Sequence, residues 1–348
     1  MRVDPPLAHG SILSGLWRAA RASRLPHALL FEGPSGVGKF CAARRFAAGL
    51  LCAEGPGDPC GVCGPCKRIA SGGWRGNHPD VHVLDPLEEE QETIKVERIA
   101  EREGGEESLE GFLGLRAFEG GFRVVLVREA HRMTPAAQNA LLKTLEEPGA
   151  DTLLVLETDR PETLLETLRS RCVRVRFGRL SEGDAARILG AADVPRDQAL
   201  RLARWCGGSP GDALALAARG GAELLSILAD VLHGRRPPIA GARAALAIEG
   251  AFEGATSRAE ERDRARTVLD LLLAIAADAR RAAAGVPRAE LAHGDLFAEG
   301  APRHLDRAAV LSLLTARADV DRNLGPAAVV ERSMLVLARG ARVTSAGP

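Results

Sequence analysis

The stretch Gly33-Pro34-Ser35-Gly36-Val37-Gly38-Lys39-Phe40 decides the fold of the first half of this chain. It follows the phosphate-binding pattern G-x-x-x-x-G-K up to its last position, where Ser or Thr normally provides a hydroxyl ligand for Mg²⁺. Here that position is Phe40, and a phenyl ring offers no oxygen to this cation. We therefore predict a loop shaped for phosphate that lacks one magnesium ligand. Its expected phosphate contacts are Gly33, Gly36, Gly38 and Lys39.

The flanking segments place this loop between a strand and a helix. Residues 27–32 form a short apolar run, which is typical of a buried parallel strand, and residues 40–51 carry apolar side chains on one helical face. A helix that begins at the loop directs its free N–H groups and positive dipole end toward phosphate. Further strands are expected at 81–84, 122–127, 152–157 and 173–177, with helical segments at 94–113, broken by Gly104-Gly105, and at 135–147. Such alternation predicts a doubly wound parallel α/β domain.

A second magnesium-related position is also changed. The strand at 122–127 is followed by Arg128-Glu129, where a P-loop ATPase usually carries two acidic residues. The first carboxylate supports Mg²⁺ and the second polarises the attacking water. Because Arg128 replaces the first carboxylate and Phe40 replaces the hydroxyl, we expect no ATP hydrolysis by this chain itself.

Four of the seven cysteines are clustered. Cys52, Cys60, Cys63 and Cys66 are spaced as C-x7-C-x2-C-x2-C. In a cytosolic chain thiols stay reduced, so this clustering favours a metal over disulfides. Four thiolates complete the tetrahedral shell of a structural zinc ion. The alternative is four free or redox-active thiols, and the spacing favours zinc.

The second half of the chain reads as helical. After residue 179 the sequence predicts three short helices up to residue 220, followed by helices at 223–233, 240–250, 258–284 and 304–339. Their apolar faces either pack on each other or serve contacts between subunits, and the periodicity leaves both open. The expected domains are 1–178, with the cysteine insert at 52–66, then 179–220 and 221–348.

Composition excludes several classes of protein. The chain has 348 residues, with 46 basic and 46 acidic side chains, so no overall field draws it to nucleic acid or a membrane surface. No apolar run approaches the roughly 20 residues of a membrane span. The first ten residues lack the charged-then-apolar pattern of a signal peptide. We expect a cytoplasmic protein.

Several segments together resemble bacterial clamp-loader subunits of the AAA+ class. They are the residues from His27 to Lys39, the cysteine insert, Asn139-Ala-Leu-Leu-Lys-Thr-Leu-Glu-Glu-Pro148, Leu168-Arg-Ser-Arg-Cys172 and Gly208-Ser-Pro-Gly211. The resemblance covers residues 1 to 220. It implies an AAA+ domain with a zinc module, a three-helix lid domain and an all-α collar domain that serves oligomerisation.

Within that family, gamma/tau motor subunits keep the intact loop, an acidic pair and an arginine at the start of the third lid helix. This chain has Phe40, Arg128 and Gly211 at those places, as in the delta-prime subunits of DNA polymerase III. The resemblance implies a stator without catalysis of its own, inside a DNA-directed DNA polymerase (nucleotidyltransferase) holoenzyme. Its Arg171 would act in trans, as an arginine finger in the ATP site of a neighbour. The implied partners are gamma/tau and delta subunits in a pentameric loader, with the sliding clamp and primed DNA reached through that complex.

Other functions stay open at this stage. All the loop glycines and Lys39 are present, so a gamma/tau-like ATPase motor with tolerated substitutions is one alternative, and binding of ATP or ADP without hydrolysis is another. A zinc-bearing adaptor for DNA or a protein is the third. By its position alone, Arg171 is typical of a surface arginine at the start of a strand. The family resemblance selects it as the finger.

Overall fold

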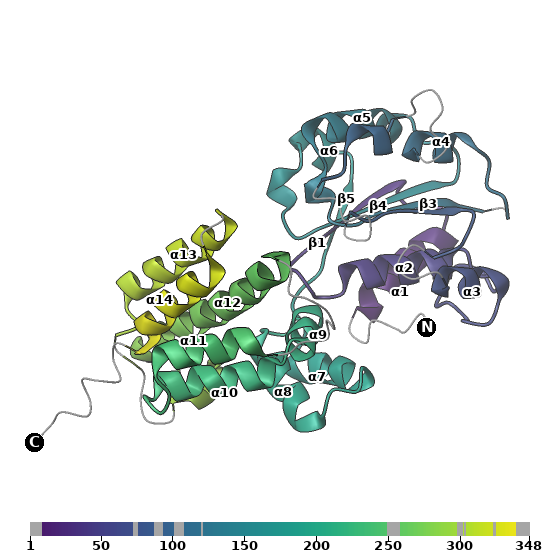
Figure 1. Cartoon of the computed structure of the whole chain (residues 1–348). Coiled ribbons are helices and arrows are strands. Elements are labelled where there is room, and N and C mark those ends of the chain that lie inside the picture. The colour runs from purple at the N-terminus through teal and green to yellow at the C-terminus, as the bar shows by residue number, and fades with distance from the viewer. Residues whose placement is uncertain are drawn as a thin grey trace, which may run out of the picture. The chain divides into compact units, whose positions relative to one another are not determined.

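The computed structural model describes residues 9–71, 76–86, 93–100, 108–119, 121–248, 258–297, 302, 304–322 and 325–338. The chain divides into two compact units, Met1–Asp184 and Ala185–Pro348. Figure 1 shows the sheet in the first unit and helices throughout the second.

The first unit contains a five-stranded sheet in which every pairing is parallel. The order across the sheet is β2-β3-β4-β1-β5, so β1 lies between the two strands that come last in the sequence. The strands are β1 (Ala28–Glu32), β2 (Val81–Leu84), β3 (Arg123–Val127), β4 (Thr152–Thr158) and β5 (Val173–Arg176). The helices of this unit are α1 (Gly10–Arg21), α2 (Lys39–Leu50), α3 (Gly64–Ala70), α4 (Leu109–Gly114), α5 (Pro135–Glu146) and α6 (Glu166–Arg169).

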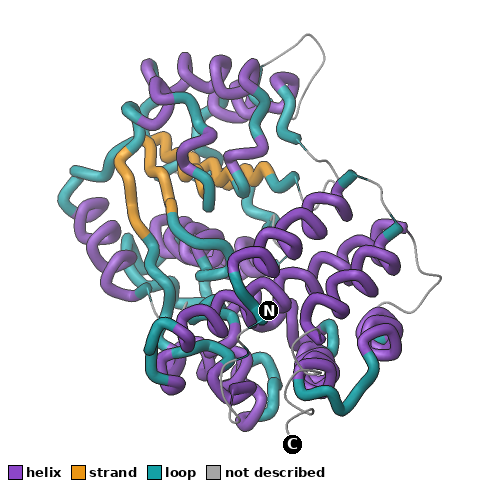
Figure 2. The backbone as a smooth tube through the Cα atoms, turned by 90° about the vertical axis from the view of Figure 1, so that its left-hand side faces the viewer, coloured by secondary structure: helices purple, strands orange, loops and turns teal. Residues whose placement is uncertain are grey.

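Helices cover both faces of this sheet, with α1, α2 and α3 on one face and α5 and α6 on the other (Figures 1 and 2). Alternate residues of β1 face the two layers. Leu29 and Phe31 pack in the core with α1 and α2, whereas Ala28 and Leu30 pack in the core with α5. All five residues of β1 are buried, as expected for a strand with helices on both sides. The predicted doubly wound α/β fold is confirmed.

Two predicted helical segments differ in extent from the structure, and the predicted break at Gly104-Gly105 lies outside the described residues. Within 94–113 the described residues form a 3₁₀ turn, Val96–Arg98, and the short helix α4, and residues 101–107 lie outside the described part. The Ser108 side chain accepts a hydrogen bond from the backbone N–H of Gly111, so α4 has its own N-terminal cap. The predicted helix at 304–339 is two helices, α13 (Arg307–Asp321) and α14 (Pro326–Ala338). Pro326 occupies the first position of α14, where its missing N–H costs nothing.

The second unit is helical in its described part. Its helices are α7 (Glu182–Ala191), which begins at the end of the first unit, α8 (Arg196–Trp205), α9 (Pro210–Ala218), α10 (Gly221–Leu232), α11 (Pro238–Ala247), α12 (Arg258–Ala283), α13 and α14, with 3₁₀ turns at Arg288–Glu290 and Gly294–Phe297. One hydrophobic core joins Leu202 of α8 and Leu216 of α9 to Leu272 of α12 and Met334 of α14. The predicted lid region therefore shares a core with the predicted collar region. No helix in the described ranges is long and apolar enough to cross a membrane.

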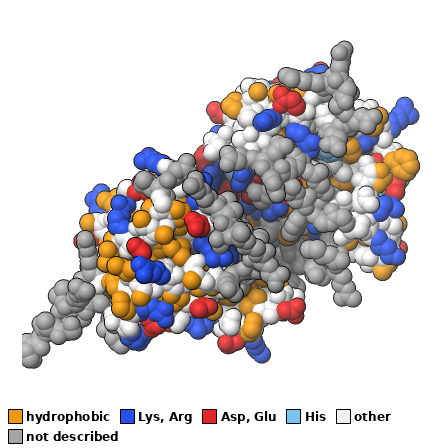
Figure 3. Space-filling view, in the orientation of Figure 1, with side chains coloured by type: hydrophobic (Ala, Val, Ile, Leu, Met, Phe, Trp, Pro, Cys, Tyr) orange, Lys and Arg blue, Asp and Glu red, His pale blue; other side chains and the backbone are white. Residues whose placement is uncertain are grey.

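Figure 3 shows many hydrophobic side chains on the visible face of this second unit. Its exposed large hydrophobic residues are Leu200, Ile239, Leu311, Leu314 and Leu335.

Candidate functional site

The glycine loop leads from β1 into α2, as the sequence predicts. Gly38 has a φ of 93° and immediately precedes α2, a backbone conformation that favours glycine. Gly33 has a φ of 149°, and a Cβ atom there would lie 2.2 Å from the carbonyl oxygen of Phe177. These two glycines are therefore required by the backbone path of the loop itself.

Lys39, the lysine of the motif, is paired within the chain. Its side chain is 3 % exposed, and its Nζ lies 2.8 Å from the carbonyl oxygen of Pro34 and 3.0 Å from Oε1 of Glu157. The other oxygen of Glu157 accepts a hydrogen bond of 3.1 Å from the backbone N–H of Glu129. A phosphate group at this loop would have to compete with the Glu157 carboxylate for the lysine.

Phe40 and Arg128, the two changed magnesium positions, are neighbours in space. The Arg128 guanidinium carbon lies 5.3 Å from the centre of the Phe40 ring, within cation–π range. Nη1 of Arg128 donates a hydrogen bond of 2.9 Å to Oδ2 of Asp85, a carboxylate that is almost fully buried. A guanidinium and an aromatic ring therefore lie together where the motif predicts a hydrated cation. The remaining acidic residue, Glu129, accepts a hydrogen bond from Arg132.

Sequence reasoning missed three carboxylates around this loop. Asp85 follows β2, Glu157 lies near the end of β4, and Glu32 ends β1. Glu32 is buried and forms ion pairs with both Arg174 and Arg176 of β5. All three could have been found from the sequence, because each is an acidic residue at the carboxyl end of a predicted parallel strand. Open α/β sheets bind their ligands at this edge.

Arg171 lies apart from these contacts, after the short helix α6. Its Nη2 is 2.5 Å from Oε1 of Glu146, the last residue of α5, and its Nη1 donates a hydrogen bond of 2.9 Å to the carbonyl oxygen of Thr167. The neighbouring Cys172 is buried, and this burial raises the pKa of its thiol to about 12, so the thiol stays neutral. Arg171 is thus an exposed arginine whose neighbours in the sequence, Leu168 and Cys172, are buried. Lys39 contacts Pro34 and Glu157, so within the described residues Arg171 and Lys39 have no contact partner in common.

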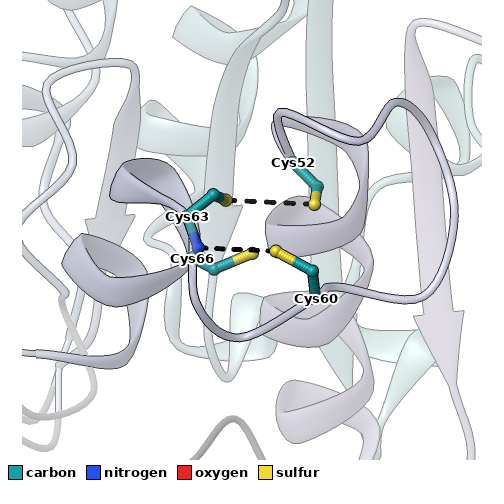
Figure 4. Close-up of side chains that lie close together, drawn as sticks. All are labelled: Cys52, Cys60, Cys63 and Cys66. Atoms are coloured by element: carbon teal, nitrogen blue, oxygen red, sulfur yellow. Dashed lines mark hydrogen bonds between the residues drawn. The ribbon is translucent and has the colours of Figure 1, made fainter.

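The four cysteine sulfurs converge. They lie within 4.8 Å of one another, and the cysteines come from the loop between α2 and α3 and from α3 itself (Figure 4). Four sulfurs bound to zinc at about 2.3 Å would lie about 3.8 Å apart in a tetrahedron. The sulfurs of Cys52 and Cys63 are 3.9 Å apart, which fits that geometry. The predicted cluster therefore forms, and an all-sulfur set of this size suits a metal such as zinc.

The environment of Cys63 favours its thiolate form. Burial opposes ionisation, but hydrogen bonds from the backbone N–H groups of Ala53 and Cys66 lower the pKa of the Cys63 thiol to about 6. A thiolate is the form that binds a metal. Cys60 also accepts a hydrogen bond of 3.4 Å, from the backbone N–H of Cys63.

The cysteine loop packs closely on α2. A Cβ atom at Gly49 would lie 1.9 Å from the carbonyl oxygen of Gly57, and Gly57 donates a backbone hydrogen bond to Gly49. Arg45 of α2 forms an ion pair with Asp58. The cysteine cluster is thereby joined to the helix that carries Lys39.

Comparison with known proteins was consistent with these features. The family model described as DNA polymerase III, delta subunit, matches residues 8–181. The chain is 38% identical over 166 residues to DNA polymerase III subunit delta' of Bacillus subtilis, covering 48% of this chain and 46% of that protein. It is 39% identical over 198 residues to subunit delta' of Escherichia coli, covering 56% of each. To subunit tau/gamma of Haemophilus influenzae it is 36% identical over 212 residues, covering 59% of this chain and 29% of that protein.

The chain spans about half the length of the curated delta' relatives that it matches. Among solved structures, a DNA polymerase III gamma subunit-related protein of Thermotoga maritima aligns with a TM-score of 0.45 and 17% identity, covering 95% of this chain and 99% of that one. The family match runs from the residues before α1 through the glycine loop, the cysteine cluster and Arg171. The chain therefore belongs to the DNA polymerase III delta subunit family.

Proposed function

We propose that this chain is a delta-prime-like stator subunit of a DNA polymerase III clamp loader, which loads a sliding clamp onto primed DNA. In this proposal the chain hydrolyses no ATP, and Arg171 enters the ATP site of an adjacent gamma/tau subunit. The observation that carries it is the Phe40–Arg128–Asp85 contact at the magnesium position. A guanidinium there repels a divalent cation, and its partner Asp85 is already engaged.

The role of Arg171 follows from its chemistry and exposure. A guanidinium inserted in trans neutralises charge on the phosphoryl group being transferred, an effect worth roughly 10³ to 10⁵ in rate in well-studied NTPases. Arg174 and Arg176 share the buried carboxylate of Glu32, whereas the carboxylate that Arg171 contacts, Glu146, is half-exposed and releases the guanidinium more readily. The proposed partners are gamma/tau and delta subunits, and the exposed hydrophobic residues of the helical unit favour a collar that contacts them.

The test is reconstitution of the loader from this chain with gamma/tau and delta subunits, a sliding clamp and primed DNA. Arg171→Ala should strongly reduce DNA-stimulated ATP hydrolysis and clamp loading. The control is Arg160→Ala, which removes another exposed arginine of the same unit. If Arg171→Ala hydrolyses ATP and loads clamps like the parent chain, the trans role is excluded.

A gamma/tau-like motor is the second candidate. It is favoured by the formed glycine loop with Lys39 and by identity to tau/gamma proteins comparable to that with delta' proteins. A motor requires that the purified chain turns over ATP and that Lys39→Ala abolishes the turnover. Absence of turnover with Mg²⁺, clamp and DNA present rejects the motor and leaves the stator.

We also propose that the four cysteines hold a structural zinc ion. The convergence of the four sulfurs and the 3.9 Å between those of Cys52 and Cys63 support this assignment. Metal analysis of the purified chain should find one zinc per chain, and Cys60→Ser should lower that content. A chain that folds with fewer than about 0.1 equivalents of any metal would contradict it.

A further inference from the structure

Arg171 is held by two acceptors on different elements. Glu146 ends α5 and accepts from Nη2 at 2.5 Å, while Thr167 lies in α6 and its carbonyl oxygen accepts from Nη1 at 2.9 Å. Among the residues that the structure describes, Glu146 is the carboxylate that Arg171 contacts. The guanidinium is therefore oriented by a fork of two partners.

The backbone beneath this fork is itself anchored. The Gln138 side chain in α5 accepts a hydrogen bond of 2.7 Å from the backbone N–H of Leu165, at the start of α6. Leu168 and Cys172, on either side of Arg171, are buried in the core that contains Leu141 of α5. Since both ends of the segment are buried in the core that α5 shares, the contact with Glu146 sets where the arginine head group lies.

The two contacts leave donors available. Arginine carries five N–H donors, and Arg171 directs one hydrogen bond to each acceptor while its side chain remains 36 % exposed. Holding an arginine in one rotamer costs side-chain entropy. If the Arg171 side chain is already ordered before it meets a phosphate, it loses less conformational entropy on binding.

Glu146 also reduces the positive charge presented by Arg171. However, Glu146 is 52 % exposed, so solvent screens its charge, and a short exposed ion pair of this kind is individually weak. Screening keeps the charge effect small, and the orienting contact predicts a slower reaction when Glu146 is removed.

We propose that Glu146 is a positioning residue that orients Arg171 toward the phosphoryl group of ATP bound by the adjacent subunit. The proposal rests on the trans role of Arg171 proposed above. It assigns a function in this chain to the first of the two adjacent glutamates, Glu146 and Glu147.

A double-mutant cycle in the reconstituted loader tests this. The variants are Glu146→Ala, Glu146→Gln, Arg171→Ala and the double variant Glu146→Ala/Arg171→Ala, with Glu147→Ala as the control because Glu147 is its exposed neighbour. The measurements are kcat and KM for DNA-stimulated ATP hydrolysis, with thermal melting of each variant to verify folding. Fixing one mobile side chain is worth about 0.5–1.5 kcal/mol, which corresponds to about a two- to tenfold change.

We expect Glu146→Ala to lower kcat about two- to tenfold with KM unchanged, Glu146→Gln to recover part of the rate because its amide oxygen still accepts, and Glu147→Ala to behave like the parent chain. In the Arg171→Ala background, Glu146→Ala should have no further effect. An unchanged or raised kcat for Glu146→Ala, or an equal loss in both backgrounds, overturns the proposal. If Arg171→Ala itself has no effect, the trans role fails instead, so the two failures are distinguishable.

Discussion

At the scale of one residue, Arg128 occupies the place where a P-loop ATPase carries its first acidic residue. The loop backbone retains its glycines and its lysine, but the Arg128 guanidinium stacks near Phe40 and pairs with Asp85. Mg²⁺ requires oxygen ligands in a near-octahedral arrangement. The Arg128 guanidinium supplies no oxygen, and its positive charge repels a cation. Lys39 is likewise paired, with Glu157.

Restoring the two lost groups should restore magnesium dependence. In Phe40→Ser/Arg128→Asp we expect labelled ATP to bind at least about tenfold more tightly with Mg²⁺ than with EDTA, because a hydroxyl and a carboxylate become available to the ion. Equilibrium binding to the purified chain measures this. The parent chain should show no such difference, and adding Lys39→Ala to the double variant should remove the gain. Magnesium-stimulated binding by the parent would contradict the account of the site.

His9 links stability to pH near the same loop. Its Nε2 lies 2.8 Å from the carbonyl oxygen of Val37, and burial lowers its pKa from 6.5, against the opposing effect of that hydrogen bond. The unfolded chain therefore binds more protons than the folded chain below about pH 6.5, so stability is lost as the pH falls through this range. His9→Gln should show a shallower loss of melting temperature between pH 7.5 and 5.5 than the parent. Equal slopes would show that His9 does not contribute.

At the scale of elements, the Gln138 side chain of α5 links the segments that precede α5 and α6 through two hydrogen bonds. It is buried, donates 3.1 Å to the carbonyl oxygen of Met133 before α5, and accepts 2.7 Å from the N–H of Leu165 before α6. One side chain thereby joins the loop after β3 to the loop after β4. This connection fixes the segment that carries Arg171.

Loss of the Gln138 amide should therefore be costly. Gln138→Ala removes the partner of the buried Met133 carbonyl and of the part-buried Leu165 N–H, and a buried polar group without a partner costs about 1–3 kcal/mol. We expect the free energy of unfolding to fall by about 2–4 kcal/mol. Denaturant unfolding measures this, and Asn139→Ala, at an exposed position on the same helix, should change it by less than about 0.5 kcal/mol. A similar small change for both variants would show that water replaces the amide.

At the scale of the whole molecule, the four-cysteine cluster belongs to one of two compact units. The cysteines lie in Met1–Asp184 and are tied to α2 through Gly49 and Arg45. The helical unit Ala185–Pro348 has its own core. Metal binding to a preformed site contributes to folding free energy where the ligands are, so its loss should act locally.

Zinc removal should therefore loosen α2 and α3 and leave the helical unit unchanged. After chelation we expect backbone amide exchange to rise at least about tenfold in the last turns of α2 and in α3, because the opening free energy there falls by at least about 1.4 kcal/mol. Hydrogen exchange read by mass spectrometry resolves the two units, and residues 221–248 serve as the internal control. Equal acceleration in that control range, or no change near the cysteines, would contradict a local structural role.

Much of the first unit is readable from sequence because its signals are local. Each of the five strands is a short run of apolar or alternating residues, the glycine motif joins a strand to a helix, and the cysteine spacing predicts the cluster that forms. Helix ends were less readable. Pro326 divides a stretch in which apolar periodicity predicts a single helix, and the Ser108 cap sets the start of α4, which the predicted break at Gly104-Gly105 does not locate.

The sequence by itself determined the parallel α/β architecture, the glycine loop with its two missing magnesium ligands, and the four-cysteine cluster. Only the tertiary structure decided that Glu157 pairs with Lys39, that Asp85 holds Arg128, and that Glu146 holds Arg171. The physical reason is distance along the chain. Motif spacing and periodicity report neighbours within a few residues, whereas each of these ion pairs joins residues 25 or more positions apart, which only the strand order and helix packing bring together.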